Sequence, residues 1–250
     1  MPLVETESLV LKSYNLAEAD KIVVLLTRDH GVVRGVAKGA KRLKSKFGSG
    51  LEPFSVVNAT YLQKENLELV SIQKIELMRS NFTAAGNPDF LQRFSYLADL
   101  LISFMPPHDP NEKLYRMAKA CVETCADDFK TLTSIGVYFE LWIVRLAGFM
   151  PDWSRCGECR RVLDEDEDAN IQANFHLLCS NCRKAASSRV LDGRAREIVG
   201  AAMRLSPRDF SAFTADRADE VAALSAILKS LISHSLGREV TGEVPLTLSV

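Results

Sequence analysis

Four cysteines arranged as two matched pairs constrain the fold of this chain more than any other feature of its sequence. Cys156 and Cys159 form one C-x2-C pair, Cys179 and Cys182 form the other, and 19 residues lie between the pairs. Two such turns complete a tetrahedral shell of four thiolates, which zinc prefers. We therefore predict one structural zinc ion, because four protein ligands leave no position open for a reacting water. A thioredoxin-like redox pair is a weaker interpretation, since it needs one C-x-x-C at the start of a helix.

Other residues near these pairs, or of the same types, have simpler interpretations. His176 is an alternative metal ligand three residues before Cys179, but four cysteines already complete the shell, so we expect a surface histidine. Cys121 and Cys125 lie four residues apart on a predicted helix, where free cysteine is most often packed in the core. The five consecutive acids at 164–168 predict a solvated hairpin tip, with repulsion of DNA or docking on a basic protein as the functional alternative.

A second constraint is the glycine-rich stretch at residues 31–50, which contains no acidic residue. Six cations fall within 13 positions of it: Arg34, Lys38, Lys41, Arg42, Lys44 and Lys46. Like charges this close repel one another and attract polyanions, of which nucleic-acid phosphate is the commonest. A solvated flexible loop is the alternative, because a basic run alone is a weak motif. The stretch makes these six side chains candidates for binding DNA.

The charge of the chain is unevenly distributed along its 250 residues, although the net charge is only −1. Residues 1–80 hold 12 Lys and Arg against 9 Asp and Glu, a net charge of +3. The remainder holds 19 against 23, a net charge of −4. This asymmetry favours a nucleic-acid-facing N-terminal part and a different task for the rest of the chain.

The first 80 residues contain five short segments rich in β-forming residues, at 7–14, 21–27, 32–37, 53–62 and 67–77. The continuous apolar run at 21–27 predicts a strand buried on both faces. Five strands with a long connection after the third are typical of an OB-fold β-barrel, which periodicity cannot separate from an SH3-like barrel. Tyr61 is a candidate for stacking on bases, although an ordinary barrel aromatic is the preferred interpretation.

After residue 80 the apolar period becomes helical. We predict helices from Pro88 to about residue 104, from an Asp109 cap to about residue 126, and over 131–148. Two more are predicted, over 193–205, closed by Ser206 and Pro207, and from residue 216 or 218. The chain is thus predicted to be an α+β multidomain protein. Its predicted domains are an OB-fold barrel at 1–80, an α-helical bundle at 81–150 and 188–250, and an inserted zinc ribbon with four cysteine ligands at 151–187.

Known catalytic patterns are absent from the sequence. There is no P-loop, dinucleotide fingerprint, nucleophile elbow or H-E-x-x-H, so the chain is predicted not to be an enzyme. A nuclease with Asp20 and Asp29 as metal carboxylates is one alternative, and a zinc-ribbon nucleic-acid-binding regulator is another. The N-terminus lacks the features of a signal peptide, and the most apolar segment, 135–150, is shorter than the ~20 residues of a membrane span, so a cytoplasmic protein is expected.

Several segments of the chain resemble the RecO family of bacterial recombination-mediator and DNA-repair proteins. The matching segments include the two C-x2-C pairs and residues 18–23, 31–42, 44–48, 51–54, 139–141, 145–151 and 234–239. The segment at 31–42 is the most specific, because many unrelated proteins carry paired C-x2-C. Two departures are Ala17, where the family usually has glycine, and the acidic run at 164–168, which many members lack.

The resemblance implies an N-terminal OB-fold, a helical domain and a zinc-ribbon insertion without a hydrolytic site. It also implies binding of single- and double-stranded DNA and annealing of complementary strands. The implied partners are RecR and the C-terminal tail of single-stranded-DNA-binding protein, with which such a protein helps to load RecA. A cytoplasmic, nucleoid-associated location follows from these partners.

Overall fold

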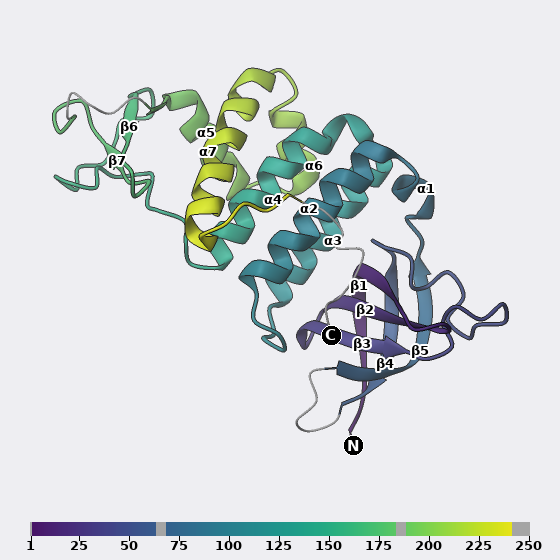
Figure 1. Ribbon diagram of the computed structural model, residues 1–250. Coiled ribbons are helices and arrows are strands. Elements are labelled where there is room, and N and C mark those ends of the chain that lie inside the picture. Colours follow the sequence, from purple (N-terminus) through teal and green to yellow (C-terminus); the bar gives the residue numbers. More distant parts are fainter. Residues whose placement is uncertain (1, 64–68, 184–188, 242–250) are drawn as a thin grey trace. The chain divides into compact units, whose positions relative to one another are not determined.

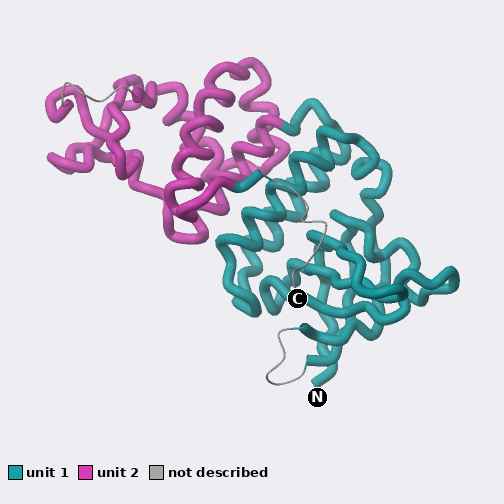
Figure 2. The backbone as a smooth tube through the Cα atoms, viewed as in Figure 1, with its two compact units in different colours: residues 1–132, 240–250 teal, residues 133–239 magenta. Residues whose placement is uncertain are grey.

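The computed structural model of the chain describes residues 2–63, 69–183 and 189–241 (Figure 1). The start of the expected fifth strand, at residues 67 and 68, lies outside these ranges, as do parts of the predicted domains at 184–188 and 242–250. The chain divides into two compact units, residues 1–132 with 240–250 and residues 133–239 (Figure 2). Compactness thus groups the first helices with the barrel, and the three domain boundaries drawn from the sequence stay a prediction.

Five strands close into a barrel at the start of the chain, which confirms the predicted fold class. They are β1 (Leu3–Leu16), β2 (Asp20–Thr27), β3 (Gly31–Ala37), β4 (Val56–Leu62) and β5 (Leu69–Arg79). Their order is β1-β2-β3-β5-β4, and β1 pairs with β4 to close the barrel. β3 and β5 pair in parallel, so β5 rather than β4 lies next to β3 in the barrel. This OB-type order differs from the successive hairpins of the SH3-like alternative.

Alternate residues of the strands fill the barrel with an apolar core. Val10, Val23, Val33 and Val57 are fully buried there, because side chains of a strand point alternately to opposite faces. The outward side chains of β2 are buried as well, so the prediction of a strand covered on both faces is confirmed.

Two helices of the first unit, α2 (Pro88–Phe104) and α3 (Glu112–Asp127), are tied to β1 by polar contacts. Lys12 on β1 is 5% exposed and forms an ion pair with Asp99 on α2. Glu7 of the same strand accepts hydrogen bonds from Tyr115 at 2.9 Å and from Lys119 at 2.5 Å, both on α3. These contacts stabilise the helices beside the barrel, because a buried cation needs an anionic partner.

The beginning of α3 differs from the sequence prediction. The helix starts at Glu112, and the side chain of Asn111 caps it by accepting a hydrogen bond from Leu114 N at 3.0 Å. Asp109 instead belongs to the preceding connection, where His108 N donates to Val32 O of β3 at 3.1 Å. The predicted Asp109 cap is therefore wrong: Asn111 meets the same requirement for an oxygen at the helix N-terminus.

The remaining helices include two that the sequence did not predict. α1 (Phe82–Ala85) follows the barrel, and α6 (Pro207–Phe213) begins where the preceding helix was expected to close. The preceding helix already ends at Ala202, so Ser206 does not close it. The hydroxyl of Ser206 instead accepts a hydrogen bond from Asp209 N at 3.2 Å and caps α6. The other elements of this part are the 3-10 turn Phe129–Thr131 and helices α4 (Leu132–Leu146), α5 (Gly193–Ala202) and α7 (Ala218–Leu236).

Side chains of α4 fix the second unit through backbone carbonyls at the end of α5. The hydroxyl of Tyr138 donates to Leu205 O at 3.1 Å, and the indole N–H of Trp142 donates to Ala202 O at 3.0 Å. A small sheet of order β7-β6-β8 lies between α4 and α5 in sequence, built from Leu177–Leu178, Ala169–Ile171 and Val190–Leu191.

Within the described ranges, every helix is too short or too polar to cross a membrane.

We expect Gly31→Ala to destabilise the first unit far more than Gly48→Ala. Both glycines have positive φ, +65° and +51°, so each substitution costs about 1 kcal/mol of backbone strain. A Cβ at position 31 would also lie 2.1 Å from Asp109 O, whereas one at 48 meets nothing within 4 Å. The added overpacking of about 1–3 kcal/mol is measurable by urea denaturation. Equal losses of stability in the two variants would show that the connection at residues 108–109 does not pack against β3.

Candidate nucleic-acid interface and metal centre

The segment between β3 and β4 carries the basic stretch, and its first half is held by the turn between β1 and β2. Gly39 N donates to the carboxylate of Asp20 at 2.7 Å, and Lys41 N donates to Ala19 O at 2.9 Å. Ala17, in the same turn, has φ +50°, a conformation that glycine adopts more easily. This geometry explains in physical terms why a glycine suits position 17, and why alanine there is strained.

The second half of the segment is anchored in the barrel by apolar side chains. Phe47 is 3% exposed and Leu51 is 2% exposed, and both belong to the barrel core. Gly50 also lies against Ile75, because a Cβ at position 50 would be 2.5 Å from its Cγ2. The basic segment is therefore a loop fixed at both halves.

All six predicted cations are exposed to solvent: Arg34, Lys38, Lys41, Arg42, Lys44 and Lys46. Within the described part of the chain, none of them forms an ion pair with an acid. Lys41 Nζ donates to Ala17 O at 3.3 Å, and Lys46 Nζ lies 5.1 Å from the ring centre of Phe47. The loop thus presents positive charge that no acid of the described ranges neutralises through an ion pair.

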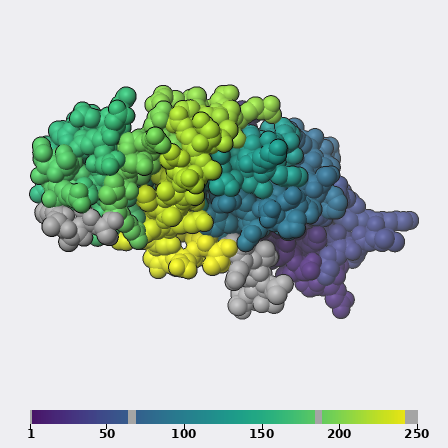
Figure 3. Space-filling view, turned by 90° about the horizontal axis from the view of Figure 1, so that it is seen from above, coloured from purple at the N-terminus to yellow at the C-terminus, as the bar shows by residue number. Residues whose placement is uncertain are grey.

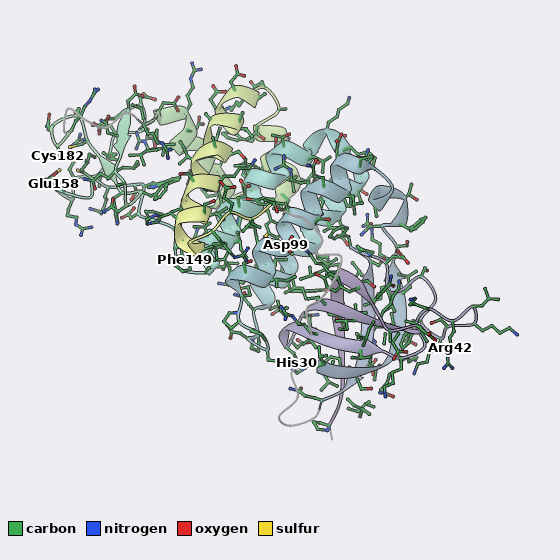
Figure 4. All side chains as sticks on the ribbon, viewed as in Figure 1. His30, Arg42, Asp99, Phe149, Glu158 and Cys182 are labelled. Atoms are coloured by element: carbon green, nitrogen blue, oxygen red, sulfur yellow. The ribbon has the colours of Figure 1, made fainter. Side chains whose placement is uncertain are left out.

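Five of these cations lie together on the loop, and one stands apart. Arg42 lies on the projecting part of the loop (Figure 4), which stands out from the surface in the space-filling view as the blue-violet segment near residue 45 (Figure 3). Arg34 lies on β3, four residues before Lys38, a separation of about 13 Å along an extended strand. A nucleic-acid strand bound along the loop would therefore contact Arg34 separately from the five loop cations.

Asp20 and Asp29, the alternative metal carboxylates of a nuclease, and Tyr61, the candidate for base stacking, all make structural contacts in the barrel. Asp20 begins β2 and binds Gly39 N, while Asp29 follows that strand and accepts a hydrogen bond from Thr6 at 2.8 Å. The seven steps of β2 alone span about 23 Å, so the two carboxylates cannot hold one metal ion. Tyr61 is fully buried in the barrel core, which confirms packing and leaves no face for a base.

The four predicted cysteine ligands converge in the second unit. Their Sγ atoms all lie within 4.8 Å of one another, and Cys159 Sγ is 3.8 Å from Cys179 Sγ. A Zn–S bond of about 2.3 Å in a tetrahedron gives sulfur separations of about 3.8 Å, whereas a disulfide needs about 2.0 Å. All four are free thiols, Cys182 lies in the loops beside β6 and β7 (Figure 4), and His176 is not part of the cluster. The donor set therefore fits a metal ion.

The electrostatics of the cluster also suit a cation. Burial raises the pKa of Cys156, but hydrogen bonds from the amides of Cys179, Cys159 and Glu158 outweigh it and lower that pKa to about 6. Hydrogen bonds with the neighbouring sulfurs of Cys179 and Cys159 raise the pKa of Cys182 to about 12. Four thiolates repel one another without a cation, so a metal ion that binds here displaces protons.

The remaining cysteines are buried in the first unit, as expected of core residues. Cys121 and Cys125 are both 0% exposed. Burial raises the pKa of Cys125 to about 12, which keeps its thiol protonated and unreactive.

These features define the class of protein: an OB-type barrel with an exposed cationic loop, followed by helices and a ribbon with four clustered cysteines. The chain matches the family model described as "Recombination protein O N terminal" over residues 1–81 and "Recombination protein O C terminal" over residues 93–242. It belongs to the RecO family of DNA repair proteins.

Curated relatives support this membership. A DNA repair protein RecO of Koribacter versatilis is 32% identical over 195 residues, which cover 75% of this chain and 76% of that protein. A DNA repair protein RecO of Geobacter metallireducens is 29% identical over 192 residues, covering 75% and 76%. One of Anaeromyxobacter sp. strain K is 25% identical over 242 residues, covering 96% and 94%, so the likeness extends along nearly the whole length of both chains.

We expect Asp20→Ala to loosen the basic loop, because it removes the acceptor of Gly39 N. The loop contains five lysines and arginines between 38 and 46, so limited digestion with trypsin reports its opening. Loss of one charge-assisted hydrogen bond of about 1.5–3 kcal/mol should raise the cleavage rate roughly 10-fold or more. Glu18→Ala changes an exposed acid in the same turn and serves as the control. Equal cleavage of Asp20→Ala and wild type would contradict the anchoring role.

Proposed function

We propose that this protein is a non-enzymatic mediator of DNA repair and homologous recombination that binds single- and double-stranded DNA through its barrel. The observation that carries the proposal is the loop of exposed cations, which form no ion pair with any acid that the structure describes. The loop is held by Asp20 on one side and by Phe47 and Leu51 on the other. Arg34, Lys38, Lys41, Arg42, Lys44 and Lys46 are the proposed DNA-binding residues.

Binding would follow from neutralisation of phosphates and release of counterions rather than from recognition of bases. Lysine and arginine on a glycine-rich loop contact backbone oxygens, and Tyr61 is buried, so the described loop offers no aromatic platform of its own. Bases of a bound strand then remain free to pair. Annealing of complementary strands is the expected consequence, because repulsion between two polyanions falls when their phosphates are neutralised.

Membership of the RecO family supports the proposed partners. RecR, the C-terminal tail of single-stranded-DNA-binding protein and RecA loading complete the proposal, which places the protein in the cytoplasm at the nucleoid. The metal centre would hold one structural zinc ion through Cys156, Cys159, Cys179 and Cys182, because four thiolates with tetrahedral spacing prefer zinc. That ion would contribute folding free energy to the ribbon and take no part in chemistry.

We expect Lys41→Glu combined with Arg42→Glu to weaken DNA binding about 10-fold or more at 0.1 M salt, for every DNA sequence alike. If the two side chains contact two phosphates of a single strand, the slope of log affinity against log salt should flatten by about 1.4. Fluorescence anisotropy with labelled single strands and duplexes, measured over a range of salt concentrations, gives both quantities.

The control for that experiment changes the same charge elsewhere. Lys113→Glu combined with Lys229→Glu reverses two exposed lysines on α3 and α7, and it should leave the slope unchanged. Binding and slope that survive the loop reversal would refute the loop assignment. Preference for one duplex sequence would instead favour the zinc-ribbon regulator, and cleavage of the labelled strand on addition of magnesium would favour an enzyme.

We expect purified protein to contain about one zinc ion per chain, and Cys156→Ser to lower that content while DNA binding persists. Cys156 is one of the two fully buried cysteines of the cluster, and its loss leaves three thiols where a structural zinc ion needs four ligands. Elemental analysis measures the zinc content, and fluorescence anisotropy of the full-length variant with labelled DNA measures the binding. Cys121→Ser replaces a buried cysteine outside the cluster and controls for packing. A zinc content near zero in reduced wild-type protein would reject the metal assignment.

A further inference from the structure

The acidic run at 164–168 does not behave as one uniform solvated tip. Asp164, Glu165, Asp166 and Asp168 are exposed, as the sequence predicted. The side chain of Glu167 is only 13% exposed, in contrast with 87% for that of Asp164. The sequence prediction is therefore correct for four of the five acids and wrong for Glu167.

The carboxylate of Glu167 contacts one residue shortly after the first C-x2-C turn and one residue within the second. Arg161, two residues after Cys159, donates to Glu167 Oε1 from Nη2 at 2.6 Å. Ser180, the residue after Cys179, donates to the same oxygen from its backbone N at 3.1 Å and from its hydroxyl at 3.2 Å. One carboxylate oxygen thus connects the first C-x2-C turn with the second.

Arg161 is the residue that links this contact to the cluster itself, because its backbone O accepts a hydrogen bond from Cys156 N at 2.8 Å. Four thiolates around one divalent ion leave two negative charges on the centre, and a nearby guanidinium offsets part of that excess. Charge-assisted hydrogen bonds between arginine and a carboxylate also fix the orientation of the guanidinium plane. Glu167 therefore holds a cation whose own backbone is bonded to the cluster.

The backbone of the acidic run is itself fixed in place from α5. Arg196 Nη2 donates to the carbonyls of Glu167 at 2.6 Å and of Glu165 at 3.1 Å, and also to that of Asp164. Gly193, at the start of α5, packs so closely that a Cβ there would lie 2.5 Å from Glu165 O. A run held by three backbone contacts positions Glu167 with little freedom, which a solvated tip would not do.

We propose that Glu167 is a positioning residue for the metal centre: it clips the two C-x2-C turns together by binding Arg161 beside the first and Ser180 within the second. The proposal rests on the proposed metal ion, and it gives the acidic run a function that charge alone does not. The other four carboxylates take no part in the clip, apart from a longer contact of Asp164 Oδ2 with Arg161 at 3.5 Å.

The test compares Glu167→Gln with Glu165→Gln in the zinc-loaded, full-length protein. Both remove one negative charge from the same run and keep the size of the side chain. Release of zinc to an excess of 4-(2-pyridylazo)resorcinol should be about 10-fold or more faster for Glu167→Gln, the usual cost of removing a residue that orients a ligand. Release from Glu165→Gln should stay within about 2-fold of wild type. Arg161→Lys keeps the charge but loses the planar fork, and it should also release zinc faster.

The outcomes separate this proposal from the proposed function. Equal release from Glu167→Gln and wild type overturns the clip, and so does equal acceleration in Glu165→Gln, because the effect would then belong to charge alone. Wild type that binds no zinc overturns the clip and the metal assignment together. DNA affinity of Glu167→Gln should match wild type, since the proposed DNA contacts belong to the barrel loop. Should Glu167→Gln not yield folded protein, Arg161→Lys against Glu165→Gln decides by the same criterion.

Discussion

Repulsion among the loop cations is the interaction on which the proposed role of this protein depends. Lysines and arginines placed within a few residues of one another would spread apart on a free chain, or find acids on the same surface. Here the hydrogen bond from Gly39 to Asp20 and the burial of Phe47 and Leu51 hold the loop at both halves. The folding free energy of the barrel therefore maintains a charge arrangement that is unfavourable until an anion approaches. Asp20 accepts a hydrogen bond from the backbone of the loop, and in the described part of the chain it forms no ion pair with the loop cations.

The barrel can hold this loop because its own outer face is covered. β2 is apolar on both faces, and such a strand is stable only between two layers. Lys12 and Glu7 on β1 engage Asp99 of α2 and Lys119 of α3, so the polar residues among these apolar side chains are paired. The same helices leave the β3–β4 loop uncovered within the first unit. Covering one side of the barrel stabilises it, while the loop on another side stays exposed to solvent.

Local patterns were sufficient to predict the elements that depend on local chemistry. Strand periodicity located all five barrel strands, and the C-x2-C spacing identified the four thiols that converge. Periodicity could not predict the order of the strands in the barrel, because the parallel pairing of β3 with β5 joins segments that are distant in the sequence. The Asp109 cap failed for a related reason: Asp109 and Asn111 are equally good caps, and the contact of His108 with Val32 decides which one is used.

The acidic run shows where composition stops being informative. Five acids in a row predict solvation, because each carboxylate is costly to bury and repels its neighbours. That argument treats the five acids as equivalent. In the structure, however, the carboxylate of Glu167 accepts hydrogen bonds from the guanidinium of Arg161 and from the backbone N–H of Ser180. Its four neighbours raise the local negative potential, which would oppose binding of DNA to this part of the chain. The same run therefore combines a general electrostatic effect, which depends on the number of charges, with one specific contact, which depends on the register of a single residue.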